Sequence, residues 1–417
     1  MAGFKSLNLL PSILEALYKK GYKSPTTIQE KSIPALLKGS DLLGIAQTGT
    51  GKTASFSLPI IDRLGRKEDR AQDKQVRALI LAPTRELATQ IYKNIISYSN
   101  GLNLRSSIAI GGVRKETQIE DLKEGSDIVV ATPGRLMDLM GGGNLKFDEL
   151  EVFVLDEADM MLDHGFFEDI KTISKKLPIK RQTVLFSATM PRQIEELAKS
   201  ILVRPVKVQS APQSSTITKI HQLVYFVEEN DKLSLLSFLL EDESIERVLV
   251  FCKAKYGVIN IVEELNTHGI SNGEIHSNRT QTQRDEAIAD FSNGKIRVLV
   301  ATDIAARGID VLDVTHVINF NLPDDATYYV HRIGRTARAG KTGIAISLCG
   351  ERDLALLRNV QKIIKKDIPI YLDHPFHKEF PPLVKKTKRT GSSASYRERK
   401  RPSQAKVRAK KKFLEHL

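Results

Sequence analysis

The sequence predicts an α/β protein built from two mostly parallel sheets, each covered by helices. Short runs rich in Val, Ile and Leu alternate with helical stretches through most of the chain. These runs are apolar throughout, which is typical of strands buried on both faces of a parallel sheet. At 417 residues the chain exceeds what one hydrophobic core usually serves, so two domains are expected.

The alternating pattern falls into two blocks, which we expect to be domains at 1–207 and 219–373. Strands in the first block are predicted at 42–46, 77–82, 107–110, 127–131, 151–155 and 182–187. Residues 208–218 are small and polar and are predicted to be a linker. Strands in the second block are predicted at 220–227, 247–252, 274–276, 297–302, 316–320 and 343–348. Ligands of such sheets bind at the carboxyl ends of the strands, so functional residues are sought there.

The composition excludes several classes of protein. No uncharged apolar run approaches the roughly 20 residues that a membrane span needs, and the first residues do not resemble a signal peptide. We therefore expect a cytoplasmic protein without a membrane partner. Cys252 and Cys349 each end an apolar run and are predicted to be buried, reduced thiols. The nine histidines are scattered, without zinc-site spacing.

The positive charge is concentrated near the C-terminus. Residues 385–412 hold 13 of the 63 Lys and Arg and a single acid, Glu398, so they carry +12 of the net charge of +13. We predict that 374–417 is a basic tail, disordered in isolation, that binds a polyanion. The alternative is a solvated tail without a partner.

A glycine-rich turn, Ala46–Thr53, follows the first predicted strand and precedes a helical stretch, as a phosphate-binding loop does. Backbone N–H groups of such a loop surround a triphosphate, and the Thr53 hydroxyl is suited to Mg²⁺. Lys52 reaches the outer phosphates and belongs to the predicted catalytic residues. Ala46 departs from the strict pattern, which has Gly there, and an ordinary surface turn is the alternative. The predicted nucleotide-binding residues are Thr48, Gly49, Thr50, Gly51, Lys52 and Thr53.

Two carboxylates follow the predicted strand 151–155. Asp156 is suited to Mg²⁺ coordination, and Glu157 is suited to polarising an attacking water. An isolated Asp-Glu pair is more often a solvated turn. Here it follows a phosphate loop by about a hundred residues and ends an apolar strand, which favours the catalytic interpretation.

The segment Asp156-Glu157-Ala158-Asp159 spells the motif that names the DEAD-box RNA helicases, and the chain resembles that family from residue 4 to about 350. The compact core and short basic tail look most like the bacterial RhlE-type branch. The resemblance implies two tandem RecA-like domains, ATP and Mg²⁺ as cofactors, and RNA as partner. It also implies that Gln29 hydrogen-bonds adenine and that Phe4 stacks on it.

Other segments of the first block match the family's RNA-contacting motifs. The resemblance places Thr84, Arg85 and Gly112 on the RNA backbone, together with Thr132 and Arg135. Hydroxyls, arginines and glycine N–H groups can hold a sugar-phosphate backbone without reading bases. Turn and helix-cap chemistry is the competing interpretation. Ser187 and Thr189 resemble the segment that couples ATP hydrolysis to strand separation, although both could be plain helix caps.

The second block carries the family's remaining motifs. His276, Gln281 and Arg284 match one motif. In another, Thr302 would contact RNA phosphate and Asp310 the ribose of ATP. A third spans 331–338, where His331 belongs to the predicted catalytic set and Arg335 and Arg338 take the arginine-finger positions. Two departures are Ala337, where many members have Gly, and 251–253, which usually has a hydroxyl residue nearby.

The resemblance implies an ATP-dependent RNA helicase whose RNA-stimulated hydrolysis drives local, non-processive unwinding of short duplexes. RNA would be held by largely sequence-independent backbone contacts, and ribosome assembly or RNA turnover would supply protein partners. One alternative is an ATP-gated RNA clamp or chaperone that anneals and remodels with little unwinding. A DNA-directed translocase and a small-molecule kinase are further alternatives, the kinase being the least consistent with a second domain and a basic tail.

Overall fold

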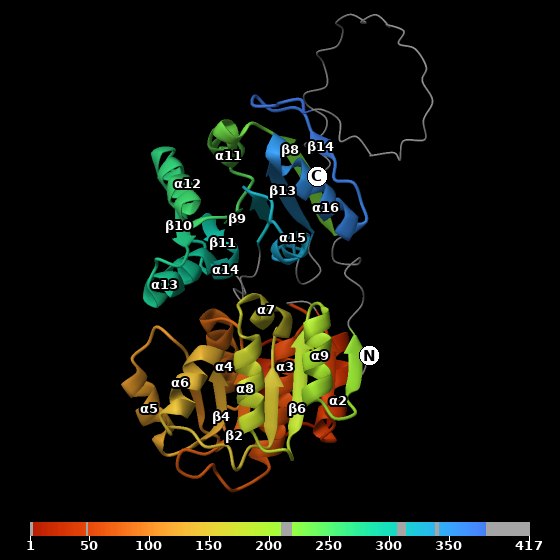
Figure 1. The fold of residues 1–417 in the computed structure, drawn as a ribbon, viewed down its shortest axis with the longest axis vertical. Helices are drawn as coiled ribbons and strands as arrows, with labels where there is room; N and C mark the ends of the chain where they lie inside the picture. Colours follow the sequence, from red (N-terminus) through yellow and green to blue (C-terminus); the bar gives the residue numbers. More distant parts are fainter. Residues whose placement is uncertain (1–2, 47–48, 210–218, 307–313, 338–341, 381–417) are drawn as a thin grey trace, which may run out of the picture. The chain divides into compact units, whose positions relative to one another are not determined.

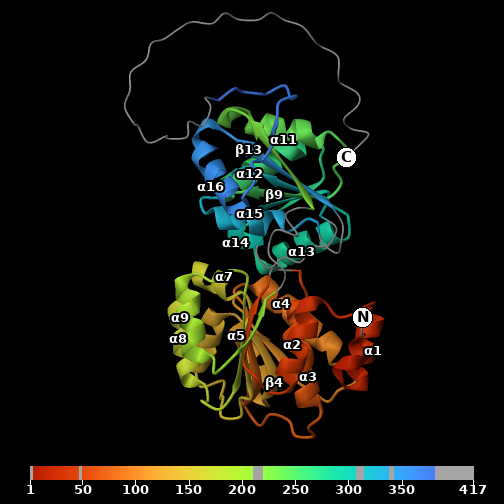
Figure 2. The same cartoon turned by 90° about the vertical axis from the view of Figure 1, so that its right-hand side faces the viewer.

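The computed structural model describes residues 3–46, 49–209, 219–306, 314–337 and 342–380, and it contains two seven-stranded sheets (Figures 1 and 2). All strand pairs in both sheets are parallel. This confirms the predicted fold class of tandem RecA-like α/β units. We call residues 3–209 the N-terminal lobe and 219–380 the C-terminal lobe.

The sheet of the N-terminal lobe has the order β3-β4-β2-β5-β6-β1-β7. Its strands are β1 (Leu42–Ile45), β2 (Val76–Leu81), β3 (Ser106–Ala109), β4 (Ser126–Ala131), β5 (Val152–Leu155), β6 (Gln182–Ser187) and β7 (Val206–Gln209). Its helices are the 3₁₀ helix η1 (Phe4–Leu7), α1 (Pro11–Lys19), α2 (Thr27–Leu37), α3 (Lys52–Gly65), α4 (Arg85–Tyr98), α5 (Lys115–Lys123), α6 (Pro133–Gly141), α7 (Ala158–Asp163), α8 (Phe167–Lys176) and α9 (Arg192–Ile201).

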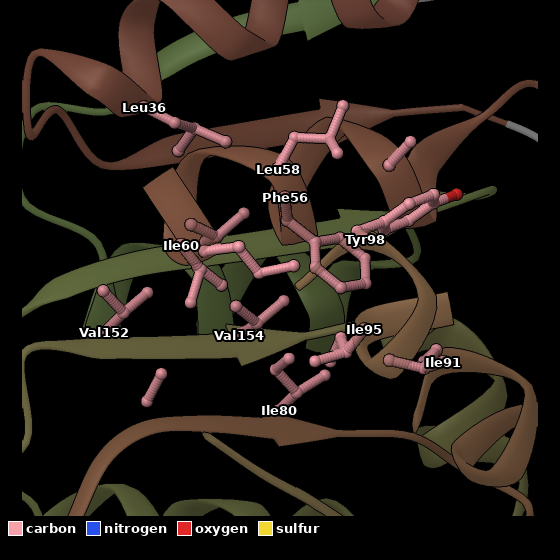
Figure 3. Packing of buried hydrophobic residues seen from close by; sticks show 14 of the residues in the cluster. Leu36, Phe56, Leu58, Ile60, Ile80, Ile91, Ile95, Tyr98, Val152 and Val154 are labelled. Carbon is pink, nitrogen blue, oxygen red and sulfur yellow. The ribbon is translucent and has the colours of Figure 1, made fainter. Parts of the chain in front are cut away.

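Alternating side chains of the central strands build one core on each face of this sheet. In β5, Val152 and Val154 join the core beneath α2, α3 and α4, whereas Phe153 and Leu155 join the core beneath α6, α8 and α9. Figure 2 shows α8 and α9 on one side of the sheet and α2 and α3 on the other. Figure 3 shows the first core, in which Phe56 packs among aliphatic side chains from α3, α4, β2 and β5. A sheet buried in this way holds its strand ends in fixed positions.

The C-terminal lobe repeats the arrangement with the order β10-β11-β9-β12-β13-β8-β14. Its strands are β8 (Ile220–Phe226), β9 (Val248–Cys252), β10 (Asn272–Ile275), β11 (Val298–Thr302), β12 (His316–Asn319), β13 (Gly343–Cys349) and β14 (Ile370–Tyr371). Its helices are η2 (Glu229–Asp231), α11 (Lys232–Leu240), α12 (Lys255–Thr267), α13 (Gln281–Ser292), α14 (Asp303–Ala306), α15 (Ala326–Ile333), η3 (Glu351–Asp353) and α16 (Leu354–Ile364). In β9, Val248 and Val250 face one core and Leu249 and Phe251 the other.

The structure corrects the predicted boundaries at the start of the linker and at the start of the tail. Residues 208 and 209, assigned to the linker, belong to β7, which pairs with β1 at the edge of the first sheet. Residues 374–380, assigned to the tail, pack on the C-terminal lobe: Phe380 lies against Phe226, and Lys378 pairs with Glu228 at 2.6 Å. Edge strands and a packed extension bury few side chains, so their sequences look like connecting segments.

Two other predictions concern the cysteines and membrane segments. Cys252 and Cys349 are both buried and free, as predicted. Across the described ranges, the helices are too short or too polar to cross a lipid bilayer.

Gly44 in β1 provides a test of how closely the sheet is packed. A Cβ atom at Gly44 would lie 2.2 Å from a ring carbon of Phe186, which is fully buried in β6. We expect Gly44→Ala to lower the free energy of unfolding by about 1–3 kcal/mol through overpacking, measured by urea denaturation. Gly141→Ala is the control, since a Cβ there meets no atom within 4 Å. Equal stabilities of the two variants would contradict this packing.

Candidate functional site

The turn between β1 and α3 has the backbone of a phosphate-binding loop. Gly49 and Gly51 have φ of 82° and 93°, left-handed values that favour glycine, and α3 begins directly after them at Lys52. A Cβ at Gly51 would also lie 2.4 Å from the side-chain nitrogen of Gln29. The first N–H groups of α3 have no partner within the helix and carry its positive dipole, so this turn is suited to an anion.

Lys52 is the central residue of the site and is only 5% exposed. Its Nζ lies 3.4 Å from Oε1 of Glu157 and 3.8 Å from Oδ1 of Asp156, at the end of β5. Burial works to lower the pKa of Lys52, but the carboxylates of Glu157 and Asp156 outweigh it, so the pKa lies above its ordinary value. The structure therefore brings the three predicted catalytic residues of this lobe into one buried cluster.

The cluster has the properties of a cation site. Asp156 is 1% exposed, and burial raises the pKa of its carboxyl to about 6 against the opposing effect of Lys52. Within the described part of the chain, Oδ1 of Asp156 accepts no hydrogen bond. With both acids ionised, one ammonium faces two carboxylates. A buried, unsatisfied carboxylate oxygen with excess negative charge around it fits Mg²⁺, and Thr53 follows Lys52 at the start of α3.

Glu157 has a strained backbone. Its φ of 55° and ψ of 54° are left-handed, which is uncommon for a residue with a side chain and typical of functional positions. Asp159, two residues after Glu157, connects the cluster to the end of β6. Oδ2 of Asp159 accepts hydrogen bonds from N and Oγ1 of Thr189, both at 2.8 Å, and Oγ of Ser187 donates to the Thr189 carbonyl at 2.6 Å. Ser187 and Thr189 are thus joined to the loop that carries Asp156 and Glu157.

Gln29 is buried at the start of α2 and braces the phosphate loop. Its Oε1 accepts from N of Thr26 at 2.9 Å, and its Nε2 donates to the carbonyl of Gly51 at 3.1 Å. The Thr26 hydroxyl donates to the carbonyl of Thr50 at 2.9 Å. An amide group offers two donors and two acceptor sites, so Gln29 keeps capacity for a further pair of hydrogen bonds. Phe4 is buried and stacks on Tyr22 with ring centroids 6.4 Å apart.

The predicted RNA-contacting residues of this lobe gather at the carboxyl ends of β2, β3 and β4. Thr84 caps α4, its Oγ1 accepting from N of Leu87 at 3.2 Å, and Thr132 precedes α6. The Arg85 guanidinium packs on Gly112, where a Cβ would lie 2.1 Å from Nη1. Arg135 donates to Oε1 of Gln118 at 2.9 Å and to the Val113 carbonyl at 3.0 Å. The structure therefore contains a feature of each interpretation: Thr84 caps a helix, and Arg85 and Arg135 lie at one edge of the sheet.

In the C-terminal lobe the predicted residues lie at strand ends and around α15. Thr302 ends β11, and buried His276 follows β10 with its Nε2 3.1 Å from Oε2 of Glu274. Burial lowers the pKa of His276. His331 lies in α15, and Arg335 is buried in the turn that follows it. The side chains of Thr48, Asp310 and Arg338 lie outside the described residues.

Ala337 adopts a φ of 56°, and it is buried. An L-residue in this left-handed region costs about 1 kcal/mol relative to glycine. The strain is a physical reason for the Gly that the resemblance leads one to expect here, and this chain accepts it beside Arg335.

Three residues with positioning roles were not among the predicted site residues. Asp159 joins the Glu157 turn to Thr189, and Gln118 orients Arg135 while donating to the Ile110 carbonyl at 3.0 Å. Arg332, 2% exposed, forms a two-point ion pair with Asp303 at 2.6 Å and donates to Asn319 and to the Asn321 carbonyl. Asp159 was visible in the motif itself. Gln118 and Arg332 depend on contacts between segments that no local pattern reveals.

Two family models match this chain. Residues 26–197 match the model described as DEAD/DEAH box helicase, and residues 231–340 match the one described as Helicase conserved C-terminal domain.

Curated relatives and solved structures cover most of the chain. The ATP-dependent RNA helicase CshA of Listeria monocytogenes is 43% identical over 88% of this chain and 69% of its own length. The RNA helicase CrhR of Synechocystis is 44% identical over 88% and 74%. Among solved structures, S. cerevisiae Dbp5 bound to RNA and ADP BeF3 is 30% identical, with a TM-score of 0.79 and coverage of 89% of this chain and 95% of that one. Mss116p bound to ssRNA and AMP-PNP is 27% identical, with a TM-score of 0.80 and coverage of 89% and 80%.

The buried Asp156 carboxyl has a testable titration. We expect it to titrate near pH 6 in the ligand-free chain rather than near its ordinary 3.8, measured by carboxyl carbon NMR with Asp156→Asn for assignment. Because the folded chain binds this proton more tightly than the unfolded chain, the contribution of this group to stability falls as the pH rises from about 4 to about 6. Asp156→Asn should remove that slope. Titration near pH 4 would contradict the buried environment.

Proposed function

The chain belongs to the DEAD-box family of ATP-dependent RNA helicases, and from this we propose that the Lys52 cluster is its ATP-hydrolysing centre. The observation that carries the proposal is the placement of Lys52, at the N-terminus of α3, against both buried carboxylates at the end of β5. A phosphate loop after β1 with two acids at the end of β5, from which β1 is separated by β6, is an arrangement suited to phosphoryl transfer to water.

ATP would enter at the turn between β1 and α3. Backbone N–H groups of residues 48–51, followed by Thr53, would surround its phosphates, with Lys52 on the outer ones. The free hydrogen-bonding capacity of Gln29 supports adenine recognition, because one donor and one acceptor match the adenine edge. Phe4 would stack on the base after exchanging its contact with Tyr22. Asp310 is proposed for the ribose on the family resemblance alone.

Lys52 would exchange partners when the nucleotide binds. In the ligand-free chain its ammonium offsets the charge of Asp156 and Glu157. Removing one partner from a buried ion pair without replacement costs about 3–5 kcal/mol, so Lys52 should leave only when other charges take its place. Asp156 and Thr53 would hold Mg²⁺, which when bound supplies charge neutralisation on the phosphate oxygens. Freed from Lys52, Glu157 can accept the proton of the attacking water.

The C-terminal lobe would contribute the remaining groups. We propose that Arg335 and Arg338 act as arginine fingers on the γ-phosphate and that His331 supports them, which would make hydrolysis depend on closure of the two lobes. Such an arginine can be worth about 10³–10⁵ in rate. Arg332, fixed by Asp303, would orient α15 so that these residues reach the nucleotide.

RNA would bind along the carboxyl edges of the sheets. We propose phosphate and sugar contacts by Thr84, Arg85, Gly112, Thr132 and Arg135, together with Thr302. The rigid Gln118–Arg135 arrangement supports a preformed backbone-binding surface. The bonds between Asp159 and Thr189 support a coupling role for Ser187 and Thr189, because a shift of the Glu157 turn must move them.

Several finer assignments remain proposals. We propose domains at 1–207 and 219–373, a linker at 208–218 and an RNA-binding tail at 374–417, with the corrections at β7 and at 374–380 that the fold requires. The RhlE-type branch stays a prediction, since the two bacterial relatives carry the names CshA and CrhR. A cytoplasmic location and partners in ribosome assembly or RNA decay also stay predictions.

The mode of RNA remodelling follows from energetics. Separating a base-pair step costs about 1.4 kcal/mol, so a closure free energy of a few kcal/mol melts only a few pairs at a time. We therefore propose local, non-processive unwinding of short duplexes, with an ATP-gated clamp as the alternative.

The direct test of the proposal is ATP hydrolysis with and without single-stranded RNA. We expect strong stimulation by RNA and not by a matched DNA strand, because the proposed closure of the lobes depends on bound RNA. Glu157→Gln should lower the stimulated rate by about 10²–10⁴ while ATP binding is retained, because it removes a general base. Glu68→Gln, at an exposed residue of the same lobe, is the control. Equal hydrolysis with RNA, DNA or neither would contradict RNA-gated closure.

A strand-displacement assay on a short duplex, with the same preparations, separates unwinding from clamping. Annealing without displacement would favour the clamp.

The basic tail is tested by deleting residues 385–417. We expect weaker RNA binding and a shallower salt dependence, by roughly 0.7 in the log–log slope for each phosphate that the chain no longer neutralises, with ATPase activity at saturating RNA retained. A chain in which the Lys and Arg of the tail are replaced by Gln separates charge from length. An unchanged salt slope would rule out the tail as an RNA-binding element.

A further inference from the structure

The amino ends of three adjacent strands form a surface far from the nucleotide site. In the order β6-β1-β7, the strands begin side by side, and they are preceded by the loops at 177–181, 38–41 and 202–205. Strands of four to six residues separate this edge from the carboxyl edge by roughly 13–20 Å. Figure 1 shows β6 together with α8 and α9, the helices that lead into two of these loops.

Asp41 and Gln182 fasten the three loops together. The Asp41 carboxylate accepts from N of Thr183 at 2.8 Å and from N of Val203 at 2.7 Å, and its carbonyl accepts from N of Val206 at 2.8 Å. Nε2 of Gln182 donates to the Ser40 carbonyl at 2.6 Å. These bonds join the 38–41 loop to the start of β6, to the 202–205 loop and to the start of β7, so this surface is held in one arrangement.

Within that arrangement two apolar side chains point into solvent. Ile179 is 99% exposed and Val203 is 69% exposed. Arg181 stabilises the turn that carries Ile179. Its Nη1 donates to the Pro178 carbonyl at 2.6 Å, and its guanidinium lies 5.7 Å from the centroid of the Phe153 ring. Leu177 is buried in the core at the other end of the turn. The fold therefore holds the Ile179 side chain in solvent, where it contributes no hydrophobic free energy to folding.

The charged residues in these loops and their immediate flanks are nearly all cationic. In 175–181, 38–41 and 199–207 the sequence has a single acid, Asp41, which is buried and bonded to backbone N–H groups. The other half of this edge differs, because Arg77 there is paired with Asp127 and Glu151. We call the exposed surface the amino-edge patch and define it by Ile179, Val203, Lys176, Lys180, Lys199 and Arg204.

We propose that the amino-edge patch docks a protein segment in which acidic side chains flank one or two apolar ones. Charge complementarity selects acidic residues, since the patch presents four exposed cations. Phosphates of RNA would use the cations but not Ile179 or Val203, so a protein segment uses more of the surface. A single exposed apolar residue needs no explanation, but two on the loops that flank the 38–41 loop, held by the bonds at Asp41 and Gln182, are pre-organised and cost little entropy to bury. The ATP and RNA residues at the opposite edge stay accessible when this segment is bound.

Methyl NMR of the full chain tests the proposal, because the methyl groups of Ile179 and Val203 report directly. The probe is a synthetic peptide of about 15 residues with leucines at helical spacing among glutamates. Its matched partners are the same peptide with serine in place of leucine and a short RNA duplex. One double variant, Ile179→Ser with Val203→Ser, replaces the apolar residues. A second, Lys180→Glu with Arg204→Glu, reverses two charges of the patch. Lys93→Glu on α4 is the control for the charge change.

We expect the leucine peptide to shift the Ile179 and Val203 methyl signals and to bind at least about 10-fold more weakly to either patch variant, but not to Lys93→Glu. The serine peptide should bind about 10-fold more weakly than the leucine peptide. RNA-stimulated ATPase activity should be unchanged in both variants, which separates this proposal from that for the Lys52 cluster. Shifts caused by the RNA duplex and equally by the serine peptide would overturn the proposal in favour of a nucleic-acid surface. The absence of shifts at both methyl groups with every probe would overturn it as well.

Discussion

The candidate site of the N-terminal lobe is built around the buried contact of Lys52 with Asp156 and Glu157. Two carboxylates at the end of β5 could not stay ionised in this environment without a nearby cation, and a lone ammonium could not stay charged there without them. Burial raises the pKa of Asp156 even though Lys52 lies nearby, so the cost of burying the charge and the attraction of the ammonium are closely balanced. Buried carboxylates that are paired with a cation of their own chain can exchange that cation for a bound one, which is the property that the proposed ATP site requires.

Strand order explains why the predicted residues meet. β1 and β5 flank β6, so the phosphate loop, the two acids and the Ser187–Thr189 segment follow three neighbouring strands. β2 lies on the other side of β5 and leads to β4 and β3, whose ends carry Arg135 and the glycines beneath Arg85. The carboxyl edge of one sheet therefore has a proposed nucleotide half and a proposed RNA half that share the β2–β5 boundary. Movement of the Glu157 turn can be transmitted through the strand ends by way of Asp159 and Thr189.

Most of the fold could be predicted from the sequence, because both sheets are built from strands buried on two faces and their apolar runs are easily recognised. It did not predict β7 or β14, since edge strands such as Val206–Gln209 expose alternate residues and resemble a polar connection. Lys52, Asp156 and Glu157, which the structure brings together, could be singled out from the sequence because they follow strand ends in a recognisable order. Gln118 and Arg332 were not, because their importance comes from hydrogen bonds between distant segments. The strained φ of Ala337 and the fixed exposure of Ile179 are likewise properties of three-dimensional packing.

The proposed mechanism rests on the exchange of Lys52 between its own carboxylates and the nucleotide. A crystal structure of the chain with Mg²⁺, ADP–BeF₃ and single-stranded RNA tests this exchange most directly. We predict that Nζ of Lys52 leaves Glu157, from which it is 3.4 Å in the ligand-free chain, and contacts the phosphate analogue while Asp156 turns to the metal. A bound complex in which Lys52 keeps its contact with Glu157 would contradict the exchange.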